Sequence, residues 1–465
     1  MEKKERGYSA HVIVFPYPSQ GHINPMLQFA KRLASKGLKI TVATTHYTVK
    51  SIHALGVSVE PISDGYDQSG FWQAPSADAY IAEFKAIGSR TLTELIQKLD
   101  RLGSPVDCVV YDSLLGWVQN VTRQLGVRGA IFFTNSSFVC SIFCRLHHGL
   151  LSLPLSSDAM PLTLPGMVPL GYSELPTFLT GVVYPAYWTM VMNQFAGLDK
   201  VDWVFGNTFE RLDGQAAKAI SDLWPVKMIG PMVPSSYLDG RIKGDTSYGA
   251  SLWKPDSDKC IQWLDTKPNG SAVYVSFGSM AEVSPKQMDE IAWGLKGCNI
   301  PFIWVVKESE QCKLPDWFEP SIEDQGLLIS WCDQLQVMAH EAVGCFVTHC
   351  GWNSTLEGLC LGLPIIGVPQ WADQPTNAKL VEDVCGVGLR AKMDGEGIVR
   401  REEIEFCIRE VIHGERGKEI KKNSRKWREL AKEAVDEGGS SDKNIDEFVS
   451  MLCGGNRSTL INGSI

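Results

Sequence analysis

Short apolar runs alternate with amphipathic helical segments twice along this chain, and this alternation constrains the fold more than any other feature. The first series predicts a strand at 10–15, a loop at 16–23 and a helix that begins near Asn24 and Pro25. Asn is a good N-cap, and Pro is favoured at the first helical position. Further elements follow in the same order, with strands at 38–43, 106–111 and 130–133 and a helix at 115–125. Strands that alternate with helices predict a parallel sheet covered on both faces.

Apolar periodicity is lost around residues 235–257, where Gly, Ser, Asp and Tyr dominate, and this stretch is predicted to be an interdomain linker. The second alternating series follows, with strands predicted at 272–277, 302–306, 327–331, 345–348 and 364–368. We therefore expect an α/β protein with two parallel-sheet domains that face each other across a cleft at the carboxyl ends of their strands. The predicted boundaries are a first domain at 1–237, a linker at 238–256, a second domain at 257–440, and a C-terminal helix and tail at 441–465, with the helix able to return to the first domain.

Bulk composition excludes several classes of partner. The 465 residues are 44% hydrophobic, which is enough for two cores, and the net charge of −9 argues against a broad nucleic-acid-binding surface. No apolar run is long enough to span a bilayer, and the N-terminus lacks the apolar core of a signal peptide. The 13 cysteines are scattered and odd in number, with no CxxC pair, so we expect reduced core cysteines and no zinc. A cytoplasmic protein without membrane insertion is expected.

The segment from Cys345 to Glu357 joins an apolar strand to a helix start. Gly351 permits a close turn, and Ser354 with Glu357 three residues later fits a capping box. A helix N-terminus suits a pyrophosphate, because its amides and dipole favour negative charge. Candidate side-chain donors to such a group are His349, Asn353, Ser354, and Ser279 from the Ser276–Ser279 turn. Taken singly, Glu357 serves equally well as a cap, and His349 as a satisfied core histidine.

Two further sites flank this segment. Trp331 ends a predicted strand, where an indole can stack on a nucleobase or can serve only in packing. Asp373 and Gln374 close the next strand and loop, and a carboxylate beside an amide can hold several sugar hydroxyls. The alternative for Asp373 is an N-cap of a helix that begins near Pro375.

The candidate reacting pair is His22 and Asp112. His22 lies just past the first strand and before a predicted helix start, which favours a neutral imidazole able to accept a proton. Asp112 follows the strand at 106–111, so both residues are expected at the same edge of a parallel sheet. If they touch, Asp112 orients His22 as an orienting carboxylate does in hydrolase triads. Loop histidines and strand-end aspartates are common, and spacing alone does not establish contact.

The stretch from Trp331 to Gln374, with GHINP at residues 21–25 and the Ser276–Ser279 turn, resembles the plant UDP-glycosyltransferases, the inverting family 1 enzymes of the GT-B type with two Rossmann-like domains. The resemblance covers nearly the whole chain. It implies UDP-glucose as donor, His22 as general base and Asp112 as its partner. It also implies that the donor is held by Gly21, Thr134, Ser279, Trp331, Cys332, Gln334, His349, Trp352, Asn353, Ser354, Glu357, Asp373 and Gln374. One departure is Asp333, which stands where the family usually has Pro and can instead cap a helix at 334–340.

The acceptor is expected to be a bulky hydrophobic plant compound, and the resemblance points to the branch that glucosylates small acids, phenols and triterpenoids. We lean towards a terpenoid. Residues of the first domain that can line its pocket, or serve equally as core, are Tyr80, Phe84, Phe138, Ile142, Phe178, Leu179, Tyr187, Met190 and Met192. The enzyme is expected to be a monomer that needs no cofactor or metal. Asp256-Ser257-Asp258 spells the DxD pattern of metal-dependent transferases, but it is interpreted as helix capping in the linker.

Two other functions remain open from the residues alone. Paired α/β domains also occur in nicotinamide-dependent oxidoreductases, although the first loop lacks GxGxxG and no ribose-binding acid follows the second strand. A nucleotide-sugar sensor that binds without transfer is the second alternative. The joint presence of His22 and Asp112 argues against a sensor, because binding alone needs neither residue.

Overall fold

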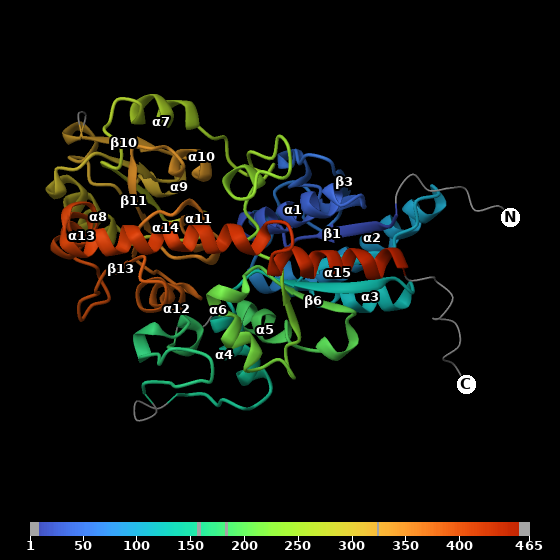
Figure 1. Cartoon of the computed structure of the whole chain (residues 1–465). Coiled ribbons are helices and arrows are strands. Elements are labelled where there is room, and N and C mark those ends of the chain that lie inside the picture. The colour runs from blue at the N-terminus through green and yellow to red at the C-terminus, as the bar shows by residue number, and fades with distance from the viewer. Residues whose placement is uncertain (1–8, 156–159, 182–184, 323–324, 455–465) are drawn as a thin grey trace. The chain divides into compact units, whose positions relative to one another are not determined.

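The computed structural model describes residues 9–155, 160–181, 185–322 and 325–454 (Figure 1). The chain divides into two compact units. Unit 1 contains the described residues of Met1–Leu153, Val183–Leu252 and Ala434–Ile465, and unit 2 those of Pro154–Val182 and Trp253–Glu433. The predicted tail at 455–465 lies outside the described residues. In the part of the chain that is described, no helix combines the length and the apolar character needed to cross a bilayer.

Unit 1 is built on a parallel sheet, which among the described residues has seven strands in the order β3-β2-β1-β4-β5-β6-β7. These strands are β1 (His11–Phe15), β2 (Lys39–Thr45), β3 (Ser58–Ile62), β4 (Cys108–Asp112), β5 (Arg128–Phe133), β6 (Trp203–Gly206) and β7 (Val226–Met228). The order reverses between β1 and β4, so loops that leave these two neighbours diverge to opposite faces of the sheet. Such a switch point is where doubly wound sheets bind ligands.

The helices of unit 1 cover this sheet through apolar faces. They are α1 (Gln20–Ser35), α2 (Ala77–Arg101), α3 (Val118–Gln124), α4 (Ser137–His147), α5 (Pro185–Asn193), α6 (Glu210–Lys218) and α15 (Ser440–Gly454). The last helix, α15, lies beside β6 (Figure 1). Its Phe448 contacts Trp203, Phe205 and Phe29. The C-terminal helix therefore completes the core of the unit that contains the N-terminal strands.

Unit 2 repeats the architecture with a parallel sheet of six strands, counted over the described residues, in the order β10-β9-β8-β11-β12-β13. These are β8 (Ala272–Ser276), β9 (Phe302–Val305), β10 (Gly326–Ile329), β11 (Val343–Thr348), β12 (Ile365–Gly367) and β13 (Gly388–Arg390). The switch point falls between β8 and β11. Its helices are α7 (Ser257–Leu264), α8 (Pro285–Cys298), α9 (Glu308–Gln311), α10 (Gln334–Met338), α11 (Trp352–Leu361), α12 (Gln374–Lys379), α13 (Arg401–His413) and α14 (Glu415–Val435), the last of which ends in unit 1. The expected α/β class with two Rossmann-like domains is confirmed.

Residues 154–182 depart from the sequence-based boundaries, which placed them in the first domain. Their described part belongs to unit 2, where Thr177 bonds Ala372 and Glu174 pairs with Arg390. These partners are 195 and 216 residues away in the sequence. The segment has little apolar periodicity, so local pattern gave no sign of such distant contacts.

The first helix also begins earlier than predicted. α1 starts at Gln20 after the N-cap Ser19, and Pro25 lies inside it. The backbone amides of His22 and Ile23 both donate to the Ser19 carbonyl, at 2.9 and 2.8 Å. His22 therefore lies within the first helical turn rather than in the loop before it.

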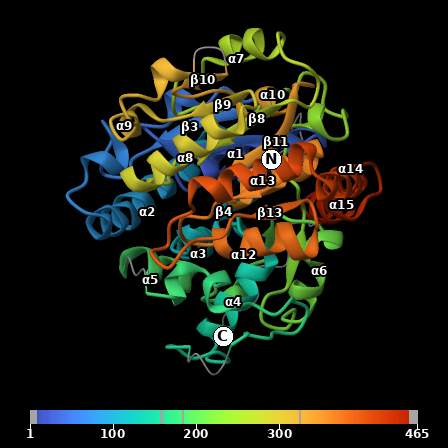
Figure 2. The same cartoon turned by 90° about the vertical axis from the view of Figure 1, so that its left-hand side faces the viewer.

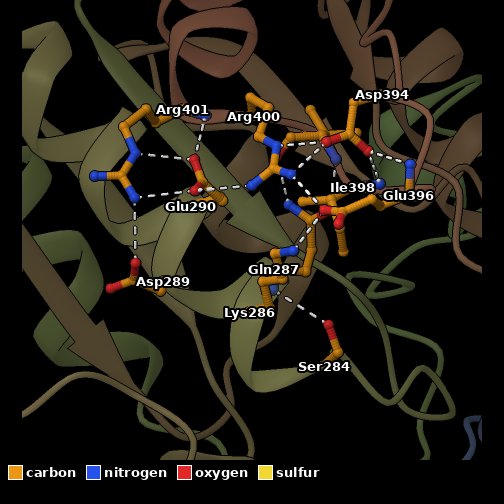
Figure 3. Close-up of polar contacts among 11 residues, drawn as sticks. Ser284, Lys286, Gln287, Asp289, Glu290, Asp394, Glu396, Ile398, Arg400 and Arg401 are labelled. Atoms are coloured by element: carbon orange, nitrogen blue, oxygen red, sulfur yellow. Dashed lines mark hydrogen bonds and ion pairs between the residues drawn. The ribbon is translucent and has the colours of Figure 1, made fainter.

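A charged cluster fastens α8 to the start of α13, and the two helices lie side by side in unit 2 (Figure 2). Glu290 on α8 accepts hydrogen bonds from the Arg401 guanidinium at 2.9 Å and from the Arg401 backbone amide at 2.7 Å (Figure 3). Gln287 exchanges two 2.8 Å hydrogen bonds with the backbone of Val399. Ser284 caps α8 by accepting from the Gln287 backbone amide at 3.2 Å, whereas the Gln287 side chain bonds Val399 and does not complete a capping box.

We expect Glu290→Gln to lower the free energy of unfolding by about 1–2 kcal/mol at pH 7, because it weakens the charge-assisted hydrogen bonds that the nearly buried Glu290 accepts from Arg401. Pairing with Arg401 lowers the pKa of Glu290 below its ordinary value. A carboxylate whose pKa is lowered in the folded state stabilises the fold fully at pH values above its unfolded-state pKa of about 4. This stabilisation is lost as the pH falls from there through the lower pKa of the folded state. Urea denaturation at pH 7 and pH 3.5 should therefore show the largest difference between wild type and variant at pH 7.

The matched control is Glu396→Gln, which alters a carboxylate of the same cluster that is 62% exposed. Exposed ion pairs contribute little to stability. Equal losses for both variants at pH 7 would contradict the role assigned to Glu290.

Candidate active site

His22 and Asp112 meet at the switch point of unit 1. β1 and β4 are paired in parallel with Phe15 opposite Tyr111, so the turn after β1 lies beside the carboxyl end of β4. His22 Nδ1 lies 2.6 Å from Asp112 Oδ2. The Asp112 side chain is fully buried and the His22 side chain is 22% exposed. The contact that spacing alone left open is therefore present.

The tautomer of His22 follows from this contact. An ionised carboxylate only accepts hydrogen bonds, so Nδ1 donates to Asp112 and the lone pair remains on Nε2. Asp112 Oδ1 is held separately, since it accepts from the backbone amide of Leu114 at 2.9 Å. Thr134, which follows β5, places Oγ1 3.3 Å from His22 Nδ1. Gly21 precedes His22 in the first turn of α1. His22 can therefore accept a proton at Nε2, and Asp112 can stabilise the resulting imidazolium.

An aromatic cluster adjoins His22. Tyr17 lies edge-on to the His22 ring at 5.6 Å between centroids, and Phe84 packs against Tyr17 and Tyr80 at 6.4 and 5.7 Å. The Tyr80 hydroxyl donates to Asp64 at 2.9 Å. Burial, then the nearby Tyr187, Asp112 and Asp64, raise the pKa of Tyr17. Aromatic rings therefore line one side of the His22 imidazole, and Tyr187 lies near Tyr17.

The proposed acceptor residues fall into two groups. Tyr80, Phe84, Phe138, Ile142, Tyr187, Met190 and Met192 belong to unit 1, and all but Tyr187 and Met192 are buried. Phe178 and Leu179 belong to unit 2, contrary to their assignment to the first domain. Phe178 lies edge-on to Trp371 at 6.4 Å. Its placement follows from the contacts of residues 154–182, which sequence periodicity did not reveal.

In unit 2, His349 lies between two loops at the switch point. The Ser276–Ser279 turn follows β8, and His349 follows β11, its neighbour in the sheet. An ideal Cβ on Gly278 would lie 2.7 Å from His349 Cε1, and one on Gly351 would lie 2.5 Å from His349 Nε2. Gly278 has φ +72, which side chains rarely adopt. Both glycines are therefore required for the imidazole to sit in this position.

The His349 imidazole is held neutral. Burial, and then the positive charge of Lys307, lower its pKa to about 4, against a hydrogen bond with the Ser276 backbone that raises it. Lys307 follows β9, and its Nζ donates to the carbonyls of Ser279 and Ala281 at 3.0 and 2.9 Å. Lys307 thus fixes the Ser279 loop and adds positive potential there. A neutral imidazole beside a cation and a helix start suits a phosphorylated ligand.

The predicted capping box at Ser354 and Glu357 is wrong. Helix α11 begins at Trp352 after the N-cap Gly351, so Ser354 and Glu357 lie inside the helix and are buried. Gln334 Nε2 donates instead to Ser354 Oγ at 3.1 Å and to Glu357 Oε2 at 2.5 Å. Glycine is needed at this N-cap because a Cβ there would meet the His349 ring, and the backbone turns just before it at Cys350, which has φ +61. Asn353 is partly exposed in the first turn, and Trp352 is buried.

Contacts with Trp253 and Tyr274 hold the segment 331–334, which is named here the wall. Trp331 is partly exposed, and its ring contacts Trp253 at 4.6 Å between centroids. Cys332 is buried, and its Sγ lies 3.3 Å from the Tyr274 hydroxyl, which also donates to Gln334 at 3.4 Å. The predicted Asp333 cap is confirmed, since Asp333 accepts from the Gln336 amide at 3.2 Å. Gln334 and Glu357, both expected at a ribose, are in direct contact.

Asp373 and Gln374 follow β12 as expected, but their contacts differ from the alternatives considered. Asp373 is the N-cap residue of α12, yet its carboxylate accepts from Asn377 Nδ2 at 2.6 Å and makes no capping bond. Gln374 Oε1 accepts from the amides of Gln370 and Trp371 at 2.8 and 3.0 Å. The Gln374 side chain therefore also shapes the loop on which it lies.

Three contributors were not recognised from the sequence. Lys307 supports the Ser279 loop, Tyr274 supports Gln334, and Asn377 supports Asp373. Lys307 lies two residues after the end of β9, which is the neighbour of the switch-point strand β8, and this placement was the available signal. The Asp256-Ser257-Asp258 pattern lies at the start of α7 in unit 2, but its interpretation as helix capping is wrong, because the N-cap residue Asp256 makes no side-chain capping bond.

Two doubly wound domains, one with a histidine–carboxylate pair at its switch point and one with a buried histidine beside a lysine and a helix start, are the architecture of a GT-B glycosyltransferase. The family model described as UDP-glucoronosyl and UDP-glucosyl transferase matches residues 213–432, and a model described as the glycosyltransferase N-terminal domain matches residues 9–60. The chain belongs to the plant UDP-glycosyltransferase family and is a UDP-glucosyltransferase.

Three known proteins illustrate this relationship. The chain is 47% identical to UDP-glycosyltransferase 74B1 of Arabidopsis thaliana, over 95% of this chain and 97% of that protein. It is 44% identical to mogroside I-E synthase of Siraitia grosvenorii, over 96% of this chain and 99% of that protein. The crystal structure of Os79 from O. sativa in complex with UDP superposes on this chain with a TM-score of 0.90 at 40% sequence identity. The match covers 95% of this chain and 100% of the Os79 chain. This membership excludes the nicotinamide oxidoreductase and the non-catalytic sensor.

Proposed function

We propose that this enzyme transfers glucose from UDP-glucose to a hydroxyl or carboxyl group of a hydrophobic plant small molecule, a terpenoid or a phenolic compound. The observation that carries the proposal is the 2.6 Å contact between His22 Nδ1 and the buried Asp112 carboxylate. Pure donor binding needs no such pair. Family membership supports glucose transfer to small-molecule acceptors.

In the proposed mechanism, His22 Nε2 takes the proton of the acceptor hydroxyl as its oxygen attacks the anomeric carbon. The bond from that carbon to the UDP oxygen breaks, and UDP leaves with the electron pair. One displacement converts the α-linked donor into a β-glucoside. Asp112 stabilises the imidazolium that forms. An acceptor carboxylic acid is already ionised at neutral pH, so it depends less on the base.

For the donor, we propose that Trp331 and Cys332 meet the base, and that Gln334 and Glu357 hold the ribose. His349, Asn353, Ser354 and Ser279 would hold the phosphates, while Trp352, Asp373, Gln374 and Thr134 would hold the hexose. The Gln334–Glu357 contact and the neutral His349 support this assignment. Preorganised donors at the pyrophosphate stabilise the leaving UDP.

We further propose that the transfer needs no metal and that the monomer, in the cytoplasm, is the active form. Lys307 and the α11 start supply the positive potential that a metal would otherwise provide at the pyrophosphate. The proposed base and the proposed donor residues all come from one chain. Eleven of the 13 cysteines are buried as free thiols, which suits a reducing compartment.

For the acceptor, the aromatic cluster beside His22 favours a large apolar compound. The relative named mogroside I-E synthase supports the preference for a terpenoid. The same cluster would also accept a phenol.

The test is release of UDP from UDP-glucose with a panel of terpenols, phenols and carboxylic acids, each with and without EDTA. We expect turnover of at least one hydrophobic acceptor, no loss in EDTA, and a β-anomeric proton coupling in the product. No UDP release with any acceptor, or an α-linked product, would refute the proposed reaction. Loss of turnover in EDTA would refute its metal independence.

A further inference from the structure

The loop at Gln370–Gln374, named here the hexose loop, is held by residues from another part of the chain. We name residues 171–181 the strap. The Thr177 backbone amide donates to the Ala372 carbonyl at 2.9 Å, and the Ala372 amide donates to Thr177 Oγ1 at 2.8 Å. One residue of the strap therefore satisfies both backbone polar groups of Ala372.

Ala372 is where such support matters. Its φ is +57, a conformation that costs free energy for a residue with a side chain and persists only when the surroundings enforce it. The neighbouring Trp371 packs against Phe178 of the strap. Within the loop, Gln374 holds the amides of Gln370 and Trp371. The loop is thus fixed from inside by Gln374 and from outside by Thr177.

The strap is itself anchored in unit 2. Glu174 is buried and pairs with Arg390 at 2.6 Å and with Lys379 at 3.1 Å. Its backbone carbonyl accepts from Thr376 Oγ1 at 2.7 Å. Lys379 and Thr376 belong to α12, the helix that begins at the end of the hexose loop. Both the loop and the helix after it are therefore attached to the strap.

From these contacts we infer that Thr177 is a positioning residue that holds Asp373 and Gln374 for the donor hexose and thereby sets the selectivity for glucose. The inference rests on the proposed hexose role of these two residues. Thr177 acts through the backbone of Ala372 and does not itself touch the donor. Because the hexose loop would contact only the sugar, loss of Thr177 should weaken recognition of UDP-glucose without weakening that of UDP.

The test is Thr177→Val, which keeps the shape of the side chain and removes the oxygen that accepts from Ala372. We expect the KM for UDP-glucose to rise about 5- to 10-fold, as for the loss of one hydrogen bond. The preference for UDP-glucose over UDP-galactose should fall, and the Kd for UDP should stay within twofold. Thr177→Ser keeps the hydroxyl and should restore the wild-type KM and selectivity.

The matched control is Thr180→Val in the same strap, because the Thr180 hydroxyl donates to the Thr177 carbonyl at 3.3 Å, a bond within the strap and not to the hexose loop. The inference is overturned if Thr177→Val and Thr180→Val give the same KM and the same selectivity. It is also overturned if Thr177→Val weakens UDP and UDP-glucose equally, or if Thr177→Ser fails to restore the wild-type values. Failure of the proposed function is a separate outcome, since the wild-type enzyme itself would then transfer no sugar.

Discussion

His22→Ala should lower kcat for an alcohol acceptor by about 100- to 10,000-fold, the usual contribution of a positioned general base. The physical reason is that Nε2 is the proton acceptor, and alanine leaves the acceptor hydroxyl protonated during attack. The Kd for UDP should not change, because the proposed donor residues other than Gly21 and Thr134 belong to unit 2. Steady-state kinetics with a phenol or terpenol, combined with calorimetric titration of UDP, measure both quantities.

Two controls sharpen this result. Asp112→Asn should also reduce kcat, because an amide accepts less well from His22 Nδ1 and no longer stabilises the imidazolium. A carboxylic acid acceptor should be much less affected by His22→Ala, since its oxygen is already ionised. If the alcohol and the acid lose activity equally in His22→Ala, the side chain serves structure or binding and not proton transfer.

The sequence predicted the central strands of both units, because each is a short apolar run bounded by turn residues. It did not predict β3, β7 and β13 at the edges of the sheets, nor β6 beside β7. Parallel-sheet geometry predicted that His22 and Asp112 lie at the same edge of the sheet but left their contact open, and the structure shows that they touch. Helix starts were harder to predict. Asn24-Pro25 is a good local start signal, yet the N-cap of α1 is Ser19, five residues before the predicted Asn24. Local propensity was overridden there by the turn that leaves β1.

The site contacts that the sequence did not predict join residues far apart in the chain. Ser354 and Glu357 matched a capping pattern, but their partner is Gln334 on another helix. Contacts of Thr177 and Glu174 with residues about 200 positions away leave no trace in local periodicity. Sequence reasoning therefore found residues at the edges of the sheets and missed those that support them.

Gly278→Ala should weaken UDP binding by about 10- to 100-fold while the protein stays folded. An alanine at φ +72 is strained, and its Cβ would lie 2.7 and 2.9 Å from the His349 ring atoms Cε1 and Nε2. Conformational strain of this kind costs about 1–3 kcal/mol, and relief requires the Ser279 loop or His349 to move. Both are proposed phosphate contacts, so the cost should be expressed in donor binding.

The matched control is Gly395→Ala in unit 2, where an added Cβ meets nothing within 4 Å and φ is not positive. Its Kd for UDP should equal that of the wild type. Calorimetric titration of UDP and the circular dichroism spectrum of each variant separate lost binding from lost folding. A folded Gly278→Ala variant with wild-type affinity would show that the imidazole of His349 and the Ser279 loop do not hold the pyrophosphate. The donor would then have to be held by the wall at Trp331–Gln334 and by the start of α11 alone.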